Sequence, residues 1–166
     1  MQKIRRRERQ IELDEIEQVV AQCHVVHTAM FDDPFPYVVP TNYGYEWIDD
    51  HLVLYLHGAR QGKKLTCIKR NPHVCVEIDT GAELMPHGQD APKYSAAYQS
   101  VIGFGTATIV ADDDLTTKQH ALDLLMQHET GRSLATFDKL DPRQIAGVGV
   151  IKIEVAELTG KAHRKS

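Results

Sequence analysis

Three segments of the chain have hydrophobic positions at helical spacing. The first carries Leu13, Ile16 and Val19 on one face and predicts an amphipathic helix over residues 12–22. The second, residues 61–70, places Leu65 and Ile68 on one face and is followed by a proline. The third begins after three consecutive aspartates at 112–114, which supply an N-cap, and should end at Gly131. These segments predict three amphipathic helices on the surface of a core.

Most other apolar residues fall in short runs that are typical of strands. Residues 24–31 and 36–46 flank an Asp-Asp-Pro turn and predict a hairpin. Residues 52–56 are apolar on both faces, which predicts a central strand, either inside a covered sheet or in a barrel wall packed from outside. Further strands are expected at 74–78, 98–110 and 148–158, and a polar loop at 80–94. Six strands joined largely by tight turns predict a mainly β fold, an antiparallel barrel with peripheral α-helices.

Two glycines in the predicted strand at 98–110 lie on the same face of it. Gly103 and Gly105 are two residues apart, so their missing side chains would let another backbone or a flat ligand come close. Curvature of a barrel wall explains them equally well.

Composition and charge narrow the classes of function. The chain has 166 residues, 42% of them hydrophobic, and a net charge of -4, so we expect one domain over 1–166 and no nucleic-acid partner. No apolar run approaches about 20 residues, so we expect no membrane span. The three cysteines form no C-x-x-C pair, which indicates reduced thiols and a cytoplasmic location. A basic N-terminal arm, residues 1–10, either contacts a phosphate or, as we favour, is solvated and pairs with acidic groups.

The nine histidines raise the question of a metal site. His24 and His27 are three residues apart, so on a strand they would point to opposite faces. His120 and His128 are two helical turns apart and have no carboxylate at ligand spacing. The sequence therefore predicts no metal site, and it contains no recognisable nucleophilic triad.

The segment between residues 57 and 64 has the outline of a phosphate cradle. Gly58 follows an apolar strand, and the predicted helix begins close to two lysines, Lys63 and Lys64. Free backbone N–H groups and the helix dipole at such a start attract an anion. Lysines there are unfavourable unless an anion offsets them, although a surface helix with solvated lysines would give the same pattern.

The predicted strand over 36–46 is unusual because it contains two prolines, Pro36 and Pro40. A proline donates no ladder hydrogen bond, so this strand should leave free carbonyls and amides along one edge, which a planar heteroaromatic ring can use. Asn42 adds an amide to that edge. Tyr43, Tyr45 and Trp47 alternate onto one face as stacking or core residues, and we expect at least two of them in the core.

Several motifs, in their order along the chain, resemble the FMN-binding split-barrel superfamily of pyridoxamine 5'-phosphate oxidase, and within it the nitroimidazole-resistance (Nim) branch. These motifs follow an Arg-rich start and are Tyr37-Val38-Val39-Pro40 with Asn42-Tyr43-Gly44-Tyr45, Leu54-Tyr55-Leu56-His57-Gly58-Ala59 with Gly62 and Lys64, Asn71-Pro72 with Val74-Cys75, Ser100-Val101-Ile102-Gly103-Phe104-Gly105, and Ile153-Glu154 with Leu158-Thr159-Gly160-Lys161. The resemblance implies a six-stranded antiparallel split β-barrel that forms a homodimer with FMN at the subunit interface.

The resemblance also implies roles for particular residues. Lys64 would bind the FMN phosphate, with His57, Gly58, Ala59 and Lys63 beside it. Four residues would face the isoalloxazine ring: Val39, Pro40, Thr41 and Asn42. Ser100 and Val101 would reach the cofactor from the neighbouring strand or from the partner subunit.

These roles suggest an FMN-dependent oxidoreductase that passes electrons or hydride from a reduced nicotinamide or another donor to a small-molecule acceptor such as a nitroaromatic. His57 is the candidate catalytic residue, although it also fits a role that only closes the phosphate loop. The alternative function is a non-catalytic flavin- or haem-binding module. A pyridoxamine-phosphate oxidase proper is disfavoured, because the chain lacks the Arg-rich C-terminal region expected of that enzyme. The loop at 80–94 is either a lid or a plain surface loop.

Overall fold

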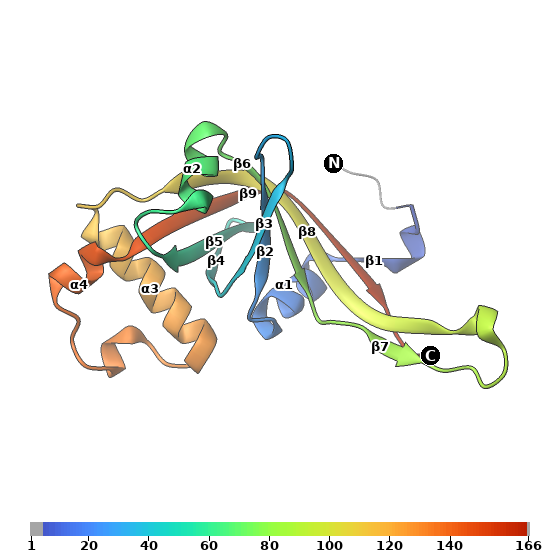
Figure 1. Ribbon diagram of the computed structural model, residues 1–166. Helices are drawn as coiled ribbons and strands as arrows, with labels where there is room; N and C mark the ends of the chain where they lie inside the picture. Colours follow the sequence, from blue (N-terminus) through green and yellow to red (C-terminus); the bar gives the residue numbers. More distant parts are fainter. Residues whose placement is uncertain (1–4, 166) are drawn as a thin grey trace.

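The computed structural model describes residues 5–165 and shows a strongly bent antiparallel sheet with helices around it (Figure 1). The strands are β1 (Gln10–Ile11), β2 (Val26–Met30), β3 (Tyr37–Thr41), β4 (Gly44–Ile48), β5 (His51–Gly58), β6 (His73–Asp79), β7 (Glu83–Met85), β8 (Ser95–Ile109) and β9 (Gly149–His163). The helices are α1 (Leu13–Gln22), α2 (Lys63–Arg70), α3 (Leu115–Thr130) and α4 (Pro142–Gly147), with short 3-10 turns at Arg7–Arg9, Ala91–Lys93 and Leu134–Thr136. Within residues 5–165, none of the helices has the length and apolar character needed to cross a membrane.

The sheet is mainly β and antiparallel, as predicted, but it has nine strands and is not closed. Its order is β3-β2-β6-β8-β9-β5-β4, with β1 added to β9 and β7 added to β8. The number of strands differs from the predicted six because residues 36–46 form two strands, β3 and the start of β4, and because the short β1 and β7 lack a recognisable run of their own. Part of the predicted N-terminal arm is thus β1, which pairs with β9 through Gln10 and Lys161, while residues 1–4 of that arm lie outside the described residues.

Strand β5 separates two hydrophobic cores. Leu54 and its neighbours at alternate positions belong to the main core, whereas Val53 and Tyr55 pack with Ala121 and Val150 on the other face. This confirms the prediction that the strand is covered on both faces, and because the sheet is not closed, it does so as part of a covered sheet. The strand is not central, however, because it lies next to the end strand β4.

The helices close the two cores from different sides. Buried residues of α1 and α2, such as Val19 and Leu65, belong to the main core. Helix α3 lies on β4 and β5, and it approaches β4 so closely that a side chain on Gly44 would meet the backbone of Leu125. The predicted helices at 12–22 and 61–70, and the one that ends at Gly131, are confirmed within two residues at their ends.

The glycines of β8 serve the packing of this chain. A Cβ on Gly105 would lie 2.3 Å from the backbone oxygen of Glu154, at a register shift between β8 and β9. A Cβ on Gly103 would meet the side chains of Val76 and Val155. Of the two explanations given for these glycines, close approach of another strand's backbone is the one seen at Gly105.

The segment predicted as a loop at 80–94 is more ordered than expected. Strand β7 pairs with the start of β8, with Leu84 opposite Ala96, and a 3-10 turn follows at Ala91–Lys93. This arm extends away from the helices α3 and α4, at the opposite end of the molecule (Figure 1). Strand β7 has three residues, and two of them are exposed. It therefore has too little hydrophobic alternation to be recognised in the sequence.

Candidate functional site

The N-terminus of α2 has backbone donors but no side chain to satisfy them. Its N-cap is Gly62, which has φ 145° and ψ 170° and makes no side-chain cap. Backbone of this kind is accessible to glycine and rarely to other residues. The hydrogen bond from Thr66 N to Gly62 O, at 3.2 Å, begins the helical ladder. The N–H groups of the first turn therefore have no acceptor within the helix, and no acidic residue lies in that turn.

Lys64 brings a positive charge to this helix start. Its side chain is half-buried, and its Nζ lies 3.8 Å from where a Cβ on Gly58 would be. Burial lowers the pKa of Lys64. The ammonium group forms no hydrogen bond or ion pair with any residue in the described part of the chain. Because a half-buried charge without a partner is costly, Lys64 and the free N–H groups together form a site suited to an anion.

Lys63 is placed differently from Lys64. Its Nζ lies 2.7 Å from Oδ2 of Asp32 and 4.8 Å from the centre of the Tyr37 ring. Asp32 also binds Arg70, at 2.5 Å, and its pKa is lowered, first by the hydrogen bond from Lys63. This pairing could not be recognised from the sequence, because Asp32 lies in the predicted turn, far from α2 in the chain. Of the two lysines, only Lys64 retains a charge without a partner.

The residues that lead into α2 are held by the sheet and by one ion pair. His57 and Gly58 pair with Val150 and Gly149 of β9. The imidazole of His57 is exposed and makes no hydrogen bond within the described residues. After Ala59, Arg60 donates from Nε to Oδ1 of Asp112 at 3.1 Å, which anchors the loop that precedes the helix. The predicted group of His57, Gly58, Ala59, Lys63 and Lys64 thus lies along the segment that leads into one helix start, where Lys64 Nζ comes close to Gly58.

Strand β3 carries the residues expected to face a ring. It pairs only with β2, so its other edge is free, as its prolines predicted. Val39 is partly buried against the main core, Pro40 is exposed, and the hydroxyl of Thr41 is buried without a hydrogen-bond partner. Asn42 donates from Nδ2 to the carbonyl of His24 at 3.0 Å, which leaves its side-chain oxygen without a partner in the described chain.

Ser100 and Val101 lie far from the cradle within one chain. Gly58 is opposite Gly149 of β9, which lies close to Ile109, the last residue of β8. Ser100 lies nine residues before Ile109 on that strand. Nine residues correspond to about 30 Å of strand. Val101 is also only 1% exposed, so its side chain belongs to the core. One chain by itself does not bring these two residues to the N-terminus of α2.

The three aromatic residues that follow β3 belong to the core, which agrees with the prediction for at least two of them. Tyr43 is fully buried, and its hydroxyl donates to the carbonyls of Val20 at 2.7 Å and Cys23 at 2.9 Å. Burial raises the pKa of Tyr43. Tyr45 and Trp47 are partly buried against the main core.

Comparison with known proteins places this arrangement in a family. The sequence profile described as pyridoxamine 5'-phosphate oxidase matches residues 12–162. No curated protein matches the chain at a significant level.

Solved structures give a second comparison. A candidate 5-nitroimidazole antibiotic resistance protein from Bacteroides thetaiotaomicron VPI-5482 is 30% identical, with 92% of this chain and 86% of that chain covered and a TM-score of 0.77. The flavocytochrome Anf3 from Azotobacter vinelandii is 16% identical, with 98% and 73% covered and a TM-score of 0.81. A protein from Mycobacterium smegmatis that binds FAD and haem is 18% identical, with 95% and 74% covered and a TM-score of 0.80. The last two similarities concern the fold alone. The family profile and the 30% identical relative together show that this chain belongs to the pyridoxamine 5'-phosphate oxidase family, the split-barrel group that its sequence motifs resemble.

Proposed function

We propose that the protein is an FMN-dependent oxidoreductase that passes electrons or hydride from a reduced nicotinamide or another donor to a small acceptor such as a nitroaromatic. The observation that carries this proposal is Lys64, a half-buried ammonium group without a partner beside the uncapped start of α2. A phosphate dianion would supply the missing acceptor for both the ammonium and the N–H groups. The 30% identical relative, a candidate 5-nitroimidazole resistance protein, supports the choice of acceptor.

The residues of this chain would bind and orient the cofactor. Lys64 and the first turn of α2 would bind the phosphate, and Gly58 would leave room for it. The free edge of β3 would hold the ring through its backbone groups, the Thr41 hydroxyl and the Asn42 side-chain oxygen. When bound, the flavin supplies the redox chemistry, and the protein tunes it through hydrogen bonds and nearby charge.

His57 is the candidate for proton transfer near the cofactor, because its imidazole is exposed next to Gly58 and forms no hydrogen bond within the described residues. For His57→Gln we expect FMN retention to stay the same and kcat to fall about 100-fold, within the range for loss of a general acid or base. Steady-state kinetics with separate determination of kcat and KM tests this. A weaker hold on FMN with unchanged kcat would instead assign His57 to closing the phosphate loop.

The proposal includes a homodimer with the flavin between two subunits. Phe31 and Phe35 are 63% and 76% exposed, and Val38, Ile102 and Phe104 are also exposed. These apolar side chains would be covered by a second copy, and Ser100 of that copy would then have a route to the cofactor that one chain lacks. Sedimentation equilibrium should give twice the mass of the chain. The three cysteines are free, which is consistent with a cytoplasmic location.

The first experiment is the visible absorption spectrum of the purified protein, recorded before and after incubation with FMN, FAD or riboflavin and desalting. We expect FMN to be retained and riboflavin, which lacks the phosphate, to be lost. Retention of FAD in preference to FMN would keep a flavin site but change the cofactor. Loss of all three flavins would contradict the assignment of the cradle.

A second candidate function is a flavin- or haem-binding module without turnover, as two structural neighbours are a flavocytochrome and a protein that binds FAD and haem. Anaerobic mixing of the FMN-loaded protein with NADH or NADPH, followed by a nitroimidazole, separates the two functions. Bleaching of the flavin and its reoxidation by the nitro compound support the oxidoreductase. A flavin that stays oxidised with each donor supports the binding module.

A further inference from the structure

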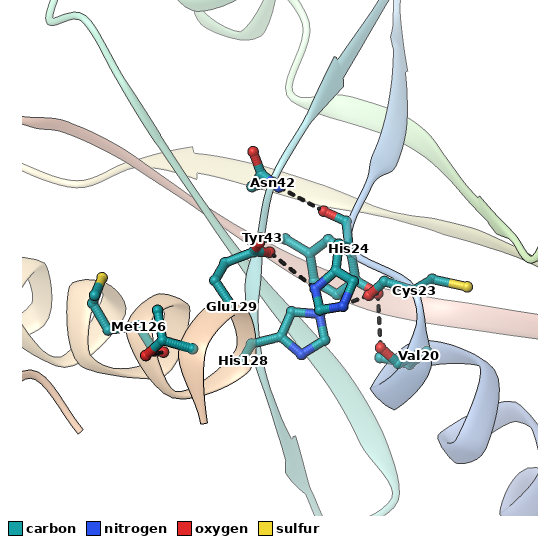
Figure 2. A network of polar contacts seen from close by, with 9 residues as sticks. Val20, Cys23, His24, Asn42, Tyr43, Met126, His128 and Glu129 are labelled. Carbon is teal, nitrogen blue, oxygen red and sulfur yellow. Dashed lines mark hydrogen bonds and ion pairs between the residues drawn. The ribbon is translucent and has the colours of Figure 1, made fainter. Parts of the chain in front are cut away.

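A cluster of three potential metal ligands lies where the segment after α1 meets the last turn of α3 (Figure 2). One nitrogen from each of His24 and His128 and one carboxylate oxygen of Glu129 all lie within 4.8 Å of one another. The closest recorded pair is His24 Nδ1 and Glu129 Oε1, at 3.5 Å. The sequence did not reveal this cluster because His24 and His128 are more than a hundred residues apart.

The imidazole of His128 is fixed by the backbone behind it. Its Nε2 lies 2.7 Å from the carbonyl oxygen of Cys23, and because a carbonyl only accepts, Nε2 carries the proton and Nδ1 keeps its lone pair. An imidazole whose Nδ1 keeps its lone pair in this way is the form that binds a metal. A hydrogen bond of this kind, on the ring nitrogen not used for the metal, is typical of metal-binding histidines.

Aromatic rings further restrict His128. The rings of Tyr43 and Tyr45 lie 4.7 Å and 5.0 Å from it, and the Tyr43 hydroxyl donates to the same Cys23 carbonyl at 2.9 Å. Figure 2 shows Cys23, His24, Tyr43 and Glu129 gathered next to the His128 ring. The cluster is therefore held in place by the packing of α1, β4 and α3.

The electrostatic surroundings favour a cation. Oε1 of Glu129 is inaccessible to solvent and, among the described residues, has no hydrogen-bond partner; its contact with His24 Nδ1 is an ion-pair distance of 3.5 Å. The cluster also lies at the C-terminal end of α3, which stops at Thr130, and the dipole of a helix places partial negative charge there. A bound cation would give Oε1 of Glu129 a partner and would interact favourably with the partial negative charge at the helix end.

The cluster remains accessible from solvent. The side chain of His24 is 53% exposed and that of Glu129 is 26% exposed. His24 also lines a surface hollow of about 400 Å³ together with Cys23, His27 and Asp79. Movement of the exposed His24 side chain would open Glu129 Oε1 to an ion, and water would occupy the coordination positions that the protein does not fill.

We propose that His24, His128 and Glu129 bind a divalent transition-metal ion of the zinc class, independently of the flavin site. Two imidazoles and one carboxylate match the preferences of such ions, whereas calcium and magnesium prefer oxygen ligands alone. Ligands at tetrahedral positions about 2.0–2.1 Å from zinc are about 3.4 Å apart, close to the 3.5 Å between His24 and Glu129. Rotation of the exposed His24 side chain would adjust its distance to His128, and rotation of the Glu129 side chain would adjust the distance between Glu129 and His128. The ion would join the segment after α1 to α3.

The test is calorimetric titration of the full-length protein with zinc chloride after removal of metals by chelator and dialysis. We expect one site per chain and a rise in melting temperature with zinc, because the ion binds only the folded arrangement. His24→Gln and Glu129→Gln should each weaken that site by at least the 10–100-fold that loss of a second-shell partner costs. His87→Gln is the matched control, because His87 is an exposed histidine outside the cluster.

The outcomes distinguish this site from zinc bound elsewhere. Loss of the site in both cluster variants, with an unchanged site in His87→Gln, supports the proposal. The proposal is overturned if the protein binds no zinc, if the cluster variants bind it as the wild type does, or if the control loses it to the same extent. Melting curves of both variants without zinc verify that they fold, and cobalt chloride in place of zinc adds a visible spectrum that reports the coordination geometry.

Discussion

Helices α3 and α2 begin in opposite ways. The start of α3 is completed by its own sequence, because the side chain of Asp114 accepts a hydrogen bond from Thr117 N at 3.0 Å. Its other end is completed by Gly131, at φ 70°. Helix α2 has Gly62 as its N-cap, no side-chain cap, and lysines in its first turn. The same chain thus contains one helix with stabilising caps at both ends and one helix whose start has no side-chain cap.

The difference separates structural features from functional ones. The N–H groups of α3 find an acceptor within the protein, and its buried Lys118 is held by Asp112 and by the carbonyl of Ala146. At α2, Asp32 balances Lys63 but nothing in the described chain balances Lys64. Proteins commonly place unsatisfied groups where a ligand completes them. We therefore interpret the start of α3 as part of the scaffold and the start of α2 as a binding site.

The largest effect on the scaffold side of this comparison is expected for Gly44→Ala. A Cβ at this position would lie 2.5 Å from Leu125 N and 2.8 Å from the carbonyl carbon of Leu124, so β4 and α3 would have to separate. We expect a loss of about 3 kcal/mol in the free energy of unfolding, the upper end of the usual overpacking range. Thermal unfolding by circular dichroism measures this. Gly147→Ala is the control, because a Cβ there meets no atom within 4 Å; equal melting temperatures for the two variants would disprove the close approach.

On the binding side, Lys64→Ala should weaken FMN binding by about 1–3 kcal/mol, or roughly 5–150-fold, because a charge-assisted hydrogen bond is lost. The fold should be unaffected or slightly more stable, since a half-buried charge is removed. Fluorescence titration with FMN gives the affinity. The control is Lys69→Ala, which removes an exposed lysine at the other end of α2 and should change the FMN affinity little. The same affinity in wild type and Lys64→Ala would remove Lys64 from the site.

The pH dependence of FMN binding gives a sharper test of the same group. The pKa of Lys64 is lowered from the ordinary 10.5 by burial, and the phosphate binds the charged form. Where free Lys64 is neutral, binding takes up a proton, so FMN affinity should be highest below the lowered pKa of Lys64 and should fall as pH rises through it. Riboflavin has the same ring but no phosphate, so its affinity should lack this component. Titrations at several pH values in wild type and Lys64→Ala check this; a fall that persists in the variant would assign it to another group.

The smallest effect is expected for Asp114→Ala, which removes the cap of α3. A lost N-cap costs about 1 kcal/mol, which corresponds to roughly 2–4 °C in melting temperature for a chain of this size. FMN affinity should stay the same, because the cap lies outside the cradle. Asp113→Ala removes an exposed aspartate next to the cap and serves as the control. A change in FMN affinity for Asp114→Ala alone would show that the two helix starts are coupled.

The sequence predicted the scaffold better than the site. Local periodicity identified α1, α2 and α3, and the apolar run at 52–56 correctly indicated a wall buried on both faces. The break between β3 and β4 was missed because residues 36–46 read as one β-rich run, and the turn there depends on a contact between Asn42 and the distant His24. Strand β7 was missed because its partner, the start of β8, supplies most of its order.

Some features of the candidate site could likewise be recognised from residues close in the chain, and others could not. The sequence indicated where an anion could bind, in the run from His57 to Lys64. Glycines, lysines and the start of a helix can be recognised there because each depends only on residues close in the chain. The sequence did not show that Asp32 occupies Lys63 and leaves Lys64 free, since that depends on the placement of the turn before β3. Nor did it show that Ser100 lies remote from the cradle, or that His24, His128 and Glu129 meet.

The amino-acid sequence by itself therefore determined the helices, most of the strands, the family resemblance and where we propose an anion cradle, because each depends on neighbours within a few residues or on the order of motifs along the chain. Only the tertiary structure decided which charges in that cradle are already paired, which aromatic rings are buried and which histidines come together. These outcomes depend on contacts between segments that are distant in the chain, and such contacts form only when the sheet brings the segments side by side.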